Sequence, residues 1–198
     1  HAHEDHIGGL DDVINSFDVE KFFMPDVLTT TKTFEDVIDA LESKQVRFET
    51  PKIGDEFNLG SANVKVIYVG EDSSNLNNTS IVLKVTYNNV SFLFMGDLEK
   101  DIEEQLLDSD ISSTVLKVGH HGSSTSSSDK FISLVNPKYA IISVGKNNSY
   151  NHPKKVVLDR LNKYNITTLR TDELGTIVFT SDGENINYYS LSTTIDGG

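Results

Sequence analysis

The chain of 198 residues opens with His1-Ala2-His3-Glu4-Asp5-His6-Ile7-Gly8-Gly9, and its interpretation builds on these nine positions. His1 and His3 are two residues apart, so in an extended chain their side chains point to the same side. Asp5 and His6 follow where the chain turns toward a helix expected over 11–16. Neutral imidazoles and carboxylates are ligands of Zn²⁺, Mn²⁺ and Fe. The motif therefore predicts two pairs of ligands for two neighbouring metal ions, with a solvated histidine-rich terminus as the alternative.

A second candidate ligand, Asp97, follows the apolar run Phe92-Leu93-Phe94-Met95-Gly96. A strand that ends in a carboxylate, just before a helix, can deliver that carboxylate between two cations. Taken alone, Asp97 fits equally the N-cap of the following helix, because Asp is a preferred capping residue. With the histidine motif at 1–6 present, we interpret Asp97 as a bridging metal ligand.

A third segment, Lys117-Val118-Gly119-His120-His121-Gly122-Ser123-Ser124, places a histidine pair between glycines after another apolar strand. Its hydroxyl-rich continuation could hold an anionic group. The alternative is a polar surface loop with an incidental histidine pair. His152 is the sixth histidine, and it precedes Pro153 at the start of an expected helix, where a surface role is the alternative. We expect all six histidines to lie in loops rather than inside helices or strands.

Composition narrows the functional classes. The 17 Lys and Arg against 30 Asp and Glu give a net charge of −13, which argues against a broad basic face for gripping nucleic acid. Nucleic acid held through a metal stays open. Cysteine is absent, so disulfides, thiolate zinc sites and cysteine nucleophiles are excluded. No apolar run is long enough to span a bilayer, so we expect no membrane segment.

Two kinds of apolar segment alternate along the chain, which predicts an α/β fold in one domain over 1–198. Phe34, Val37, Ile38 and Leu41 have helical spacing. The expected helices cover 11–16, 33–44, 99–107, 129–135 and 153–163. The expected strands cover 21–24, 64–69, 80–87, 90–95, 114–118, 139–144, 176–180 and 187–191. Pro153 suits the first position of its helix, where a missing N–H is tolerated.

Taken together, these residues resemble the metallo-β-lactamase superfamily. His1-x-His3-x-Asp5-His6 looks like its signature, and Gly96-Asp97 looks like its bridging-aspartate motif. The combination with 117–123 and with Asn147-x-x-Tyr150-Asn151-His152-Pro153 is similar to the ComEC/Rec2 competence-protein subgroup. The resemblance covers about 1–191 and implies an αββα sandwich with metal ions at one edge.

The resemblance also implies a ligand set for two divalent ions, zinc or manganese. One ion would take His1, His3 and either His120 or His121. The other would take Asp5, His6 and His152, with Asp97 between the two ions. Many members carry a further histidine ligand before the bridging aspartate, whereas here the matching region reads Asn77-Asn78-Thr79-Ser80.

The implied activity is hydrolysis by a metal-bound hydroxide. We rank a phosphodiesterase or nuclease first, with a phosphoester substrate that includes DNA. The alternatives are a lactonase or other esterase on the same site, and a non-catalytic metal-stabilised binding domain. Asp5, His120 and His121 are the candidate catalytic residues, since whichever histidine of the pair is not a ligand could protonate the leaving group. Lys117, Ser123 and Ser124 are candidates for substrate contact.

The family fold also has strands before its first motif, and this sequence has none before His1. We therefore expect the full protein to carry roughly 50 more residues upstream, or the domain to be incomplete without its N-terminal strands. The sequence favours no compartment, so extracellular, cell-surface and cytoplasmic locations all stay open, as does the oligomeric state.

Overall fold

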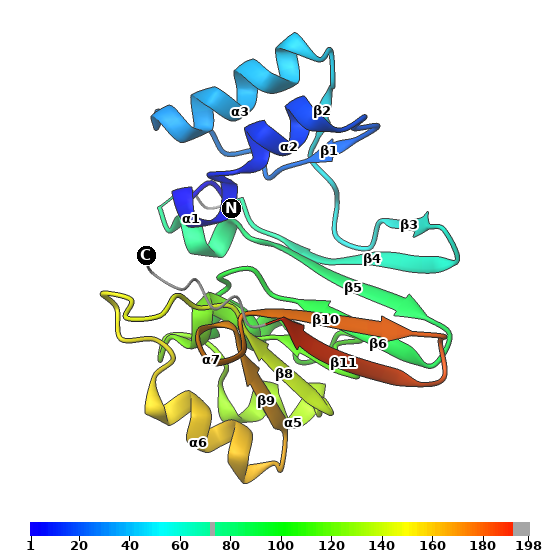
Figure 1. Cartoon of the computed structure of the whole chain (residues 1–198), viewed down its shortest axis with the longest axis vertical. Coiled ribbons are helices and arrows are strands. Elements are labelled where there is room, and N and C mark those ends of the chain that lie inside the picture. The colour runs from blue at the N-terminus through cyan, green and yellow to red at the C-terminus, as the bar shows by residue number, and fades with distance from the viewer. Residues whose placement is uncertain (72–73, 192–198) are drawn as a thin grey trace.

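The centre of the computed structural model, which describes residues 1–71 and 74–191, is a seven-stranded sheet (Figure 1). Its strand order is β3-β4-β5-β6-β7-β8-β9. The strands are β3 (Glu56–Leu59), β4 (Ala62–Val69), β5 (Ile81–Tyr87), β6 (Val90–Phe94), β7 (Val115–Lys117), β8 (Tyr139–Ile142) and β9 (Thr167–Arg170). From β3 to β6 neighbouring strands are antiparallel, and from β6 to β9 they are parallel.

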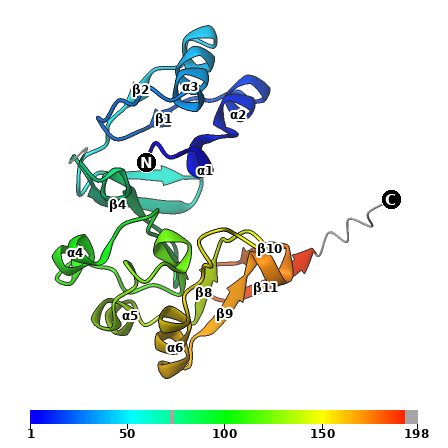
Figure 2. The same cartoon turned by 90° about the vertical axis from the view of Figure 1, so that its left-hand side faces the viewer.

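Helices cover one face of the parallel half of this sheet (Figures 1 and 2). They are α4 (Lys100–Glu103), the 3₁₀ turn η2 (Glu104–Leu106), α5 (Asp129–Val135) and α6 (Lys155–Lys163). Leu93 and Leu116 from the sheet pack with Phe131, Val157 and other fully buried side chains of the helices. Burial of this continuous apolar surface is the main force that holds the two layers together.

A hairpin of β10 (Thr176–Ser181) and β11 (Ile186–Leu191) lies across the same part of the sheet (Figure 1). Phe179 contacts Phe92 of β6 and Tyr139 of β8 edge to face, with ring centroids 6.0 and 5.5 Å apart. The tip of the hairpin is tied to the β5–β6 turn, because the Asn89 amide donates to the carbonyl of Gly183 at 2.8 Å. The hairpin therefore forms the second β layer of the described chain.

The N-terminal third forms a smaller layer beyond β4 and β5 (Figures 1 and 2). It contains α1 (Glu4–Ile7), α2 (Leu10–Ser16), α3 (Lys32–Ser43), β1 (Phe22–Phe23) and β2 (Phe48–Glu49). The helical spacing expected in α3 is confirmed, because Phe34, Val37 and Leu41 are buried. Within the described part of the chain, no helix has the length and apolar character needed to cross a membrane.

The α/β class is confirmed, and every predicted helix and strand has a counterpart. Three details are wrong. The helix expected over 99–107 is split into α4 and η2. The helix after His152 begins at Lys155, because Pro153 packs against Gly122 and Lys154 is the extended N-cap residue. His6 lies inside α1, and His120 and His121 lie in the 3₁₀ turn η3 (Gly119–Gly122), so the expectation that all six histidines lie in loops is wrong.

Parallel strands bring their carboxyl ends to one edge, where ligands of α/β sheets bind. Residues after β6 include Asp97, those after β7 include His120 and His121, and those after β8 lead to His152. Residues 192–198 of the predicted single domain lie outside the described residues, and the single domain stays a prediction.

Glu103 stabilises the segment after β7 that carries His120 and His121. Its buried side chain accepts hydrogen bonds from the backbone N–H groups of Ser127 and Ser128. We expect Glu103→Ala to lower the free energy of unfolding by about 2–4 kcal/mol, because it leaves two amide donors unpaired. The measurement is urea denaturation. The neighbouring exposed Glu104→Ala should change stability by less than about 0.5 kcal/mol. Equal effects of the two substitutions would contradict the anchoring role.

Candidate metal centre

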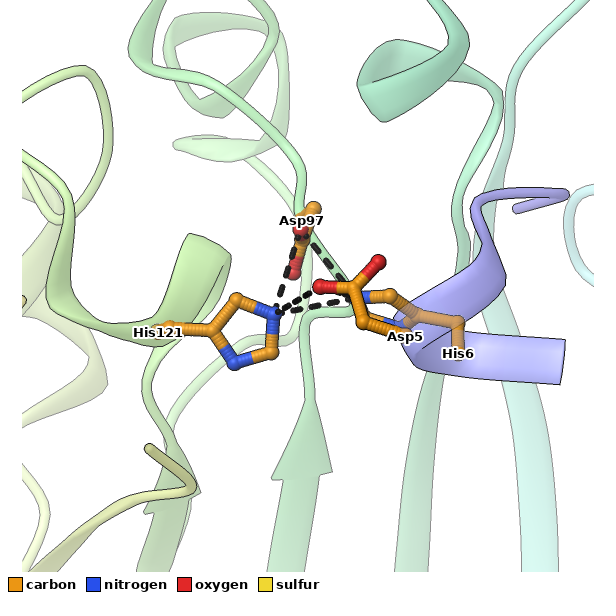
Figure 3. Close-up of side chains that lie close together, drawn as sticks. All are labelled: Asp5, His6, Asp97 and His121. Carbon is orange, nitrogen blue, oxygen red and sulfur yellow. Dashed lines mark hydrogen bonds and ion pairs between the residues drawn. The ribbon is translucent and has the colours of Figure 1, made fainter. Parts of the chain in front are cut away.

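Helix α1 supplies one carboxylate group and one imidazole group to the site. Its single turn places Asp5 and His6 side by side above the carboxyl end of β6 (Figure 3). Asp5 is exposed at the surface, whereas His6 is partly covered. Before this turn the chain is extended, and the Nε2 atom of His1 lies 3.1 Å from the Nδ1 atom of His3. The expected convergence of the first motif is therefore present.

Asp97 is delivered by a sharp turn at the end of β6. Gly96 has φ +56°, and a Cβ atom there would lie 2.6 Å from the Oγ atom of Ser80, so the turn requires glycine. The Asp97 amide donates to the same Ser80 Oγ atom at 3.0 Å. Asp97 is only 2% exposed and is not the helix N-cap, which is Glu99. The carboxylate is thus fixed in the interior rather than used to begin a helix.

Ring nitrogens from four histidines converge on one oxygen, Asp97 Oδ2. The Nε2 atoms of His6, His121, His1 and His120 lie 3.1, 3.5, 3.7 and 3.9 Å from it. His121 Nε2 is also 3.2 Å from Asp5 Oδ2 and 3.1 Å from His6 Nε2 (Figure 3). One ligand atom from each of Asp5, His6, Asp97 and His121 lies within 4.8 Å of the others, which is the arrangement a divalent ion requires.

The loop after β7 reaches this site through an unusual backbone. His120 and His121 have φ +48° and +52°, a left-handed conformation that costs non-glycine residues roughly 1–2 kcal/mol each. Together with Gly122 they form three consecutive residues of positive φ. Such conformations persist where the surrounding structure enforces them, and they cluster at functional sites. Here the strained turn aims both imidazoles at Asp97.

Hydrogen bonds at the Nδ1 atoms of His121 and His1 fix which ring nitrogen faces the candidate metal site. His121 Nδ1 lies 2.7 Å from the carbonyl of Ser143, so it must donate, and its Nε2 lone pair is free in the neutral ring. Ser80 Oγ already donates to the carbonyl of Asn77 at 2.7 Å, so it accepts from His1 Nδ1 at 3.3 Å. When neutral, both rings therefore present Nε2 as an acceptor, which is the form that binds metal, whereas a protonated His121 donates from Nε2 to Asp97.

His120 is oriented in the same way by Glu99. Its Nδ1 atom lies 3.0 Å from Thr125 Oγ1 and 3.4 Å from Glu99 Oε1, and Thr125 Oγ1 donates to the same carboxylate at 2.9 Å. A carboxylate cannot donate, so His120 Nδ1 carries the proton. The Nε2 atom of His120 is left as a lone pair directed at Asp97.

The charges of the site are strongly coupled in the metal-free protein. Burial raises the pKa of Asp97, but hydrogen bonds from His121 and His6 outweigh it and hold that pKa well below its usual range. The hydrogen bond with Asp97 in turn raises the pKa of His121, against the effect of burial. Burial lowers the pKa of His152. Asp97 is therefore an anion at neutral pH and attracts a cation into the cluster.

Two hollows open beside the cluster. The central hollow, about 440 Å³, is lined by His3, Glu4, Asp5, Asn77, Asp97, His120, His121, Tyr150 and His152. The rim hollow, about 390 Å³, is lined by Asp5, His121, Ser143, Val144, Gly145, Asn148, Tyr150, His152 and Thr171. His152 borders both, with its ring 5.9 Å from that of His120. Tyr150 stacks on His152 at 5.7 Å and is 72% exposed.

All eight residues predicted as metal ligands thus lie at this edge of the sheet. The predicted substrate contacts lie at the end of the same strand β7 or just after it, but they do not face the hollows. Lys117 Nζ donates to the carbonyl of Val118, and burial lowers its pKa. Ser123 is buried with its hydroxyl next to Thr125, and Ser124 is exposed. None of the three lines either hollow. Sequence reasoning missed the roles of Ser80, Glu99, Asn77 and Tyr150, although Tyr150 lies in a segment quoted for the resemblance and Asn77 and Ser80 lie in the segment quoted as a departure from it.

Comparison with known proteins identifies the family. The sequence model of the metallo-β-lactamase superfamily matches residues 1–146. The chain belongs to this superfamily. The crystal structure of CmlA, described as a diiron β-hydroxylase from Streptomyces venezuelae, superposes with a TM-score of 0.60 at 11% identity, covering 96% of this chain and 44% of CmlA. At that identity the likeness shows the fold alone, which is the predicted metallo-β-lactamase fold.

Curated relatives place this member of the superfamily in the ComEC/Rec2-like subgroup. It is 37% identical over 182 residues to ComE operon protein 3 of Bacillus subtilis, covering 90% of this chain and 24% of that protein. It is 42% identical over 106 residues to competence protein ComA of Neisseria gonorrhoeae, covering 52% of this chain and 15% of that protein. The chain therefore spans a quarter or less of these relatives' length. Its fold is that of metal-dependent hydrolases, which implies divalent metal ions.

Cation binding in this metallo-β-lactamase domain should weaken at low pH. A protonated His121 cannot be a ligand, and the Asp97 carboxylate raises the pKa of His121, so a bound ion has to displace a proton. We expect Mn²⁺ affinity to fall as the pH is lowered from about 8 to about 6, through the range in which histidine titrates. Calorimetric titration in two buffers of different ionisation enthalpy would measure the released protons. Equal affinity at both pH values, without proton release, would contradict this coupling.

The contact between Glu99 and His120 gives a second prediction. Glu99→Gln keeps the size of the side chain but removes the charge that orients His120 Nδ1. Losing a contact that orients a side chain at a metal site typically costs about 10–100-fold in metal affinity or activity. We expect a loss in this range, measured by Mn²⁺ titration and by hydrolysis of a model diester. The exposed Glu104→Gln is the matched control, and an unchanged Glu99→Gln variant would show that the contact is incidental.

Proposed function

We propose that this chain is a metal-dependent phosphodiesterase of the nuclease type. The observation that carries the proposal is the convergence of four histidine nitrogens on Asp97 Oδ2, within 3.9 Å. Imidazole and carboxylate ligands around a shared oxygen suit a pair of divalent ions, and zinc or manganese fits this donor set. When bound, such ions lower the pKa of water and neutralise charge on a phosphate.

The residues divide into roles by their geometry. Asp5, His6 and His121 form one ligand group with Asp97 Oδ2. His1 and His3, whose nitrogens are 3.1 Å apart, are further imidazole ligands available beside this group. His120, held by Glu99, keeps Nε2 directed at the site without belonging to the first group. We assign to His120 Nε2, a lone pair in the neutral ring, the uptake of a proton from the attacking water and its transfer to the leaving group.

The substrate class rests on charge and on the subgroup. The net charge of −13 disfavours a broad electrostatic grip on a polyanion, so a phosphodiester would be held through the ions themselves. One relative is named competence protein ComA and another is named recombination protein 2, which makes DNA the first substrate to test. The hollows beside the cluster open to the surface past Tyr150 and His152, so a diester could approach from that side.

The test compares two substrates and one variant. The chain loaded with Mn²⁺ or Zn²⁺ should hydrolyse bis-p-nitrophenyl phosphate, and a simple lactone much less. Asp97→Ala should lose at least about 100-fold in rate, because it removes the shared carboxylate. Turnover by Asp97→Ala at the rate of the unsubstituted chain would sink the two-ion mechanism. Hydrolysis of the lactone alone would favour the esterase alternative.

A further inference from the structure

Unpaired buried polar atoms collect in one place in this molecule. Among residues 1–71 and 74–191, three buried side-chain atoms have no hydrogen-bond partner: Asn77 Oδ1, Asp97 Oδ1 and His152 Nδ1. All three belong to residues that line the central hollow. A buried polar atom without a partner costs free energy of about 1–3 kcal/mol, so such atoms are rare away from functional sites. Three such atoms around one hollow indicate a binding site for a group that accepts electron pairs.

The orientation of Asn77 is set by its neighbours. Its Nδ2 atom is 3.5 Å from Glu99 Oε1, and a carboxylate can only accept, so the amide nitrogen belongs on that side. The same Glu99 is held by Asn75 Nδ2 at 2.8 Å. The carboxamide oxygen of Asn77 is therefore on the other arm of the side chain. It can only accept, and no donor of the protein reaches it.

Asn77 is also bound into the metal cluster through its backbone. Its carbonyl accepts from Ser80 Oγ at 2.7 Å, and the same hydroxyl oxygen accepts from the Asp97 amide and contacts His1. Glu99, which holds the Asn77 amide, also faces His120. Asn77 thus contacts the two groups, Ser80 and Glu99, that orient His1, Asp97 and His120. Its oxygen has the chemistry of a hard cation ligand, as carbonyl oxygens suit Mn²⁺ and Mg²⁺.

We propose that Asn77 Oδ1 is a ligand of a second divalent cation in the central hollow, shared with His3 and Asp97. This assignment rests on the proposed two-ion site and adds to it a side chain of amide type. Asp97 is suited to the sharing, because Oδ2 faces the histidines while Oδ1 is buried and unpaired. An amide oxygen adds no charge, so the second site should be the weaker of the two for a hard ion.

The test counts bound Mn²⁺ in the purified chain and three variants. The unsubstituted chain should bind two ions and give the spin-coupled electron paramagnetic resonance signal of a close pair. Asn77→Ala should keep one ion and weaken the second by at least about 100-fold, because loss of an outer contact alone costs 10–100-fold. Asn77→Asp retains an oxygen ligand and should retain both ions and the coupled signal.

Asn75→Ala is the matched control. It also removes a contact to Glu99. The Asn75 carboxamide oxygen, however, already accepts a hydrogen bond from the backbone N–H of Asn77 at 3.1 Å. It should keep both ions. The assignment is overturned if Asn77→Ala binds the second ion normally, if Asn77→Asp or Asn75→Ala loses it as fully as Asn77→Ala, or if the unsubstituted chain binds one ion at saturating Mn²⁺.

Metal counting keeps this inference separate from the proposed function. A chain that binds two ions, loses one in Asn77→Ala and hydrolyses no phosphodiester would support the ligand and refute the phosphodiesterase. A chain that hydrolyses the diester while Asn77→Ala keeps both ions would support the phosphodiesterase and refute Asn77 as a ligand.

Discussion

The buried carboxylate of Asp97 is the constraint on which the rest of the site depends. An anion that is only 2% exposed has to be compensated by nearby positive charge or by donors. His6 and His121 provide that compensation, whereas burial by itself raises the pKa of the group. The elements around it follow from this requirement: a glycine turn after β6, a serine that fixes its amide, and two histidine segments brought in from distant parts of the sequence.

The site is held together by an outer ring of hydrogen bonds as much as by its ligands. Ser80, Glu99 and the carbonyl of Ser143 each leave an Nε2 lone pair directed at Asp97. Two of these groups, Ser80 and Glu99, also contact Asn77. Hydrogen bonds therefore orient rings that come from the segment before α1 and from the loop after β7. Preorganisation of this kind is what a metal site needs, since ligands that are already aligned lose little entropy on binding.

The charge of the molecule and the chemistry of the site point to one way of handling a polyanion. With a net charge of −13 the chain has no excess of cations to hold a phosphate backbone. Bound cations in the cluster would supply the positive charge locally, where the reaction takes place. The chain covers at most a quarter of the length of ComE operon protein 3 and competence protein ComA, so its substrate stays a proposal.

The sequence by itself determined the α/β class and the pool of ligands, because strand ends, glycines and histidine spacing are local properties of the chain. It could not decide which of His120 and His121 is a ligand, since both follow the same strand, and the resemblance placed that histidine with His1 and His3 rather than with Asp5 and His6. The tertiary structure groups His121 with them and ties His120 to Glu99, through a left-handed turn that no local pattern predicts. It also moved Lys117 and Ser123 away from the hollows and revealed Asn77 and Tyr150 beside them. These outcomes depend on which side chains meet across the sheet edge, and that is set by packing between segments up to about a hundred residues apart rather than by spacing along the chain.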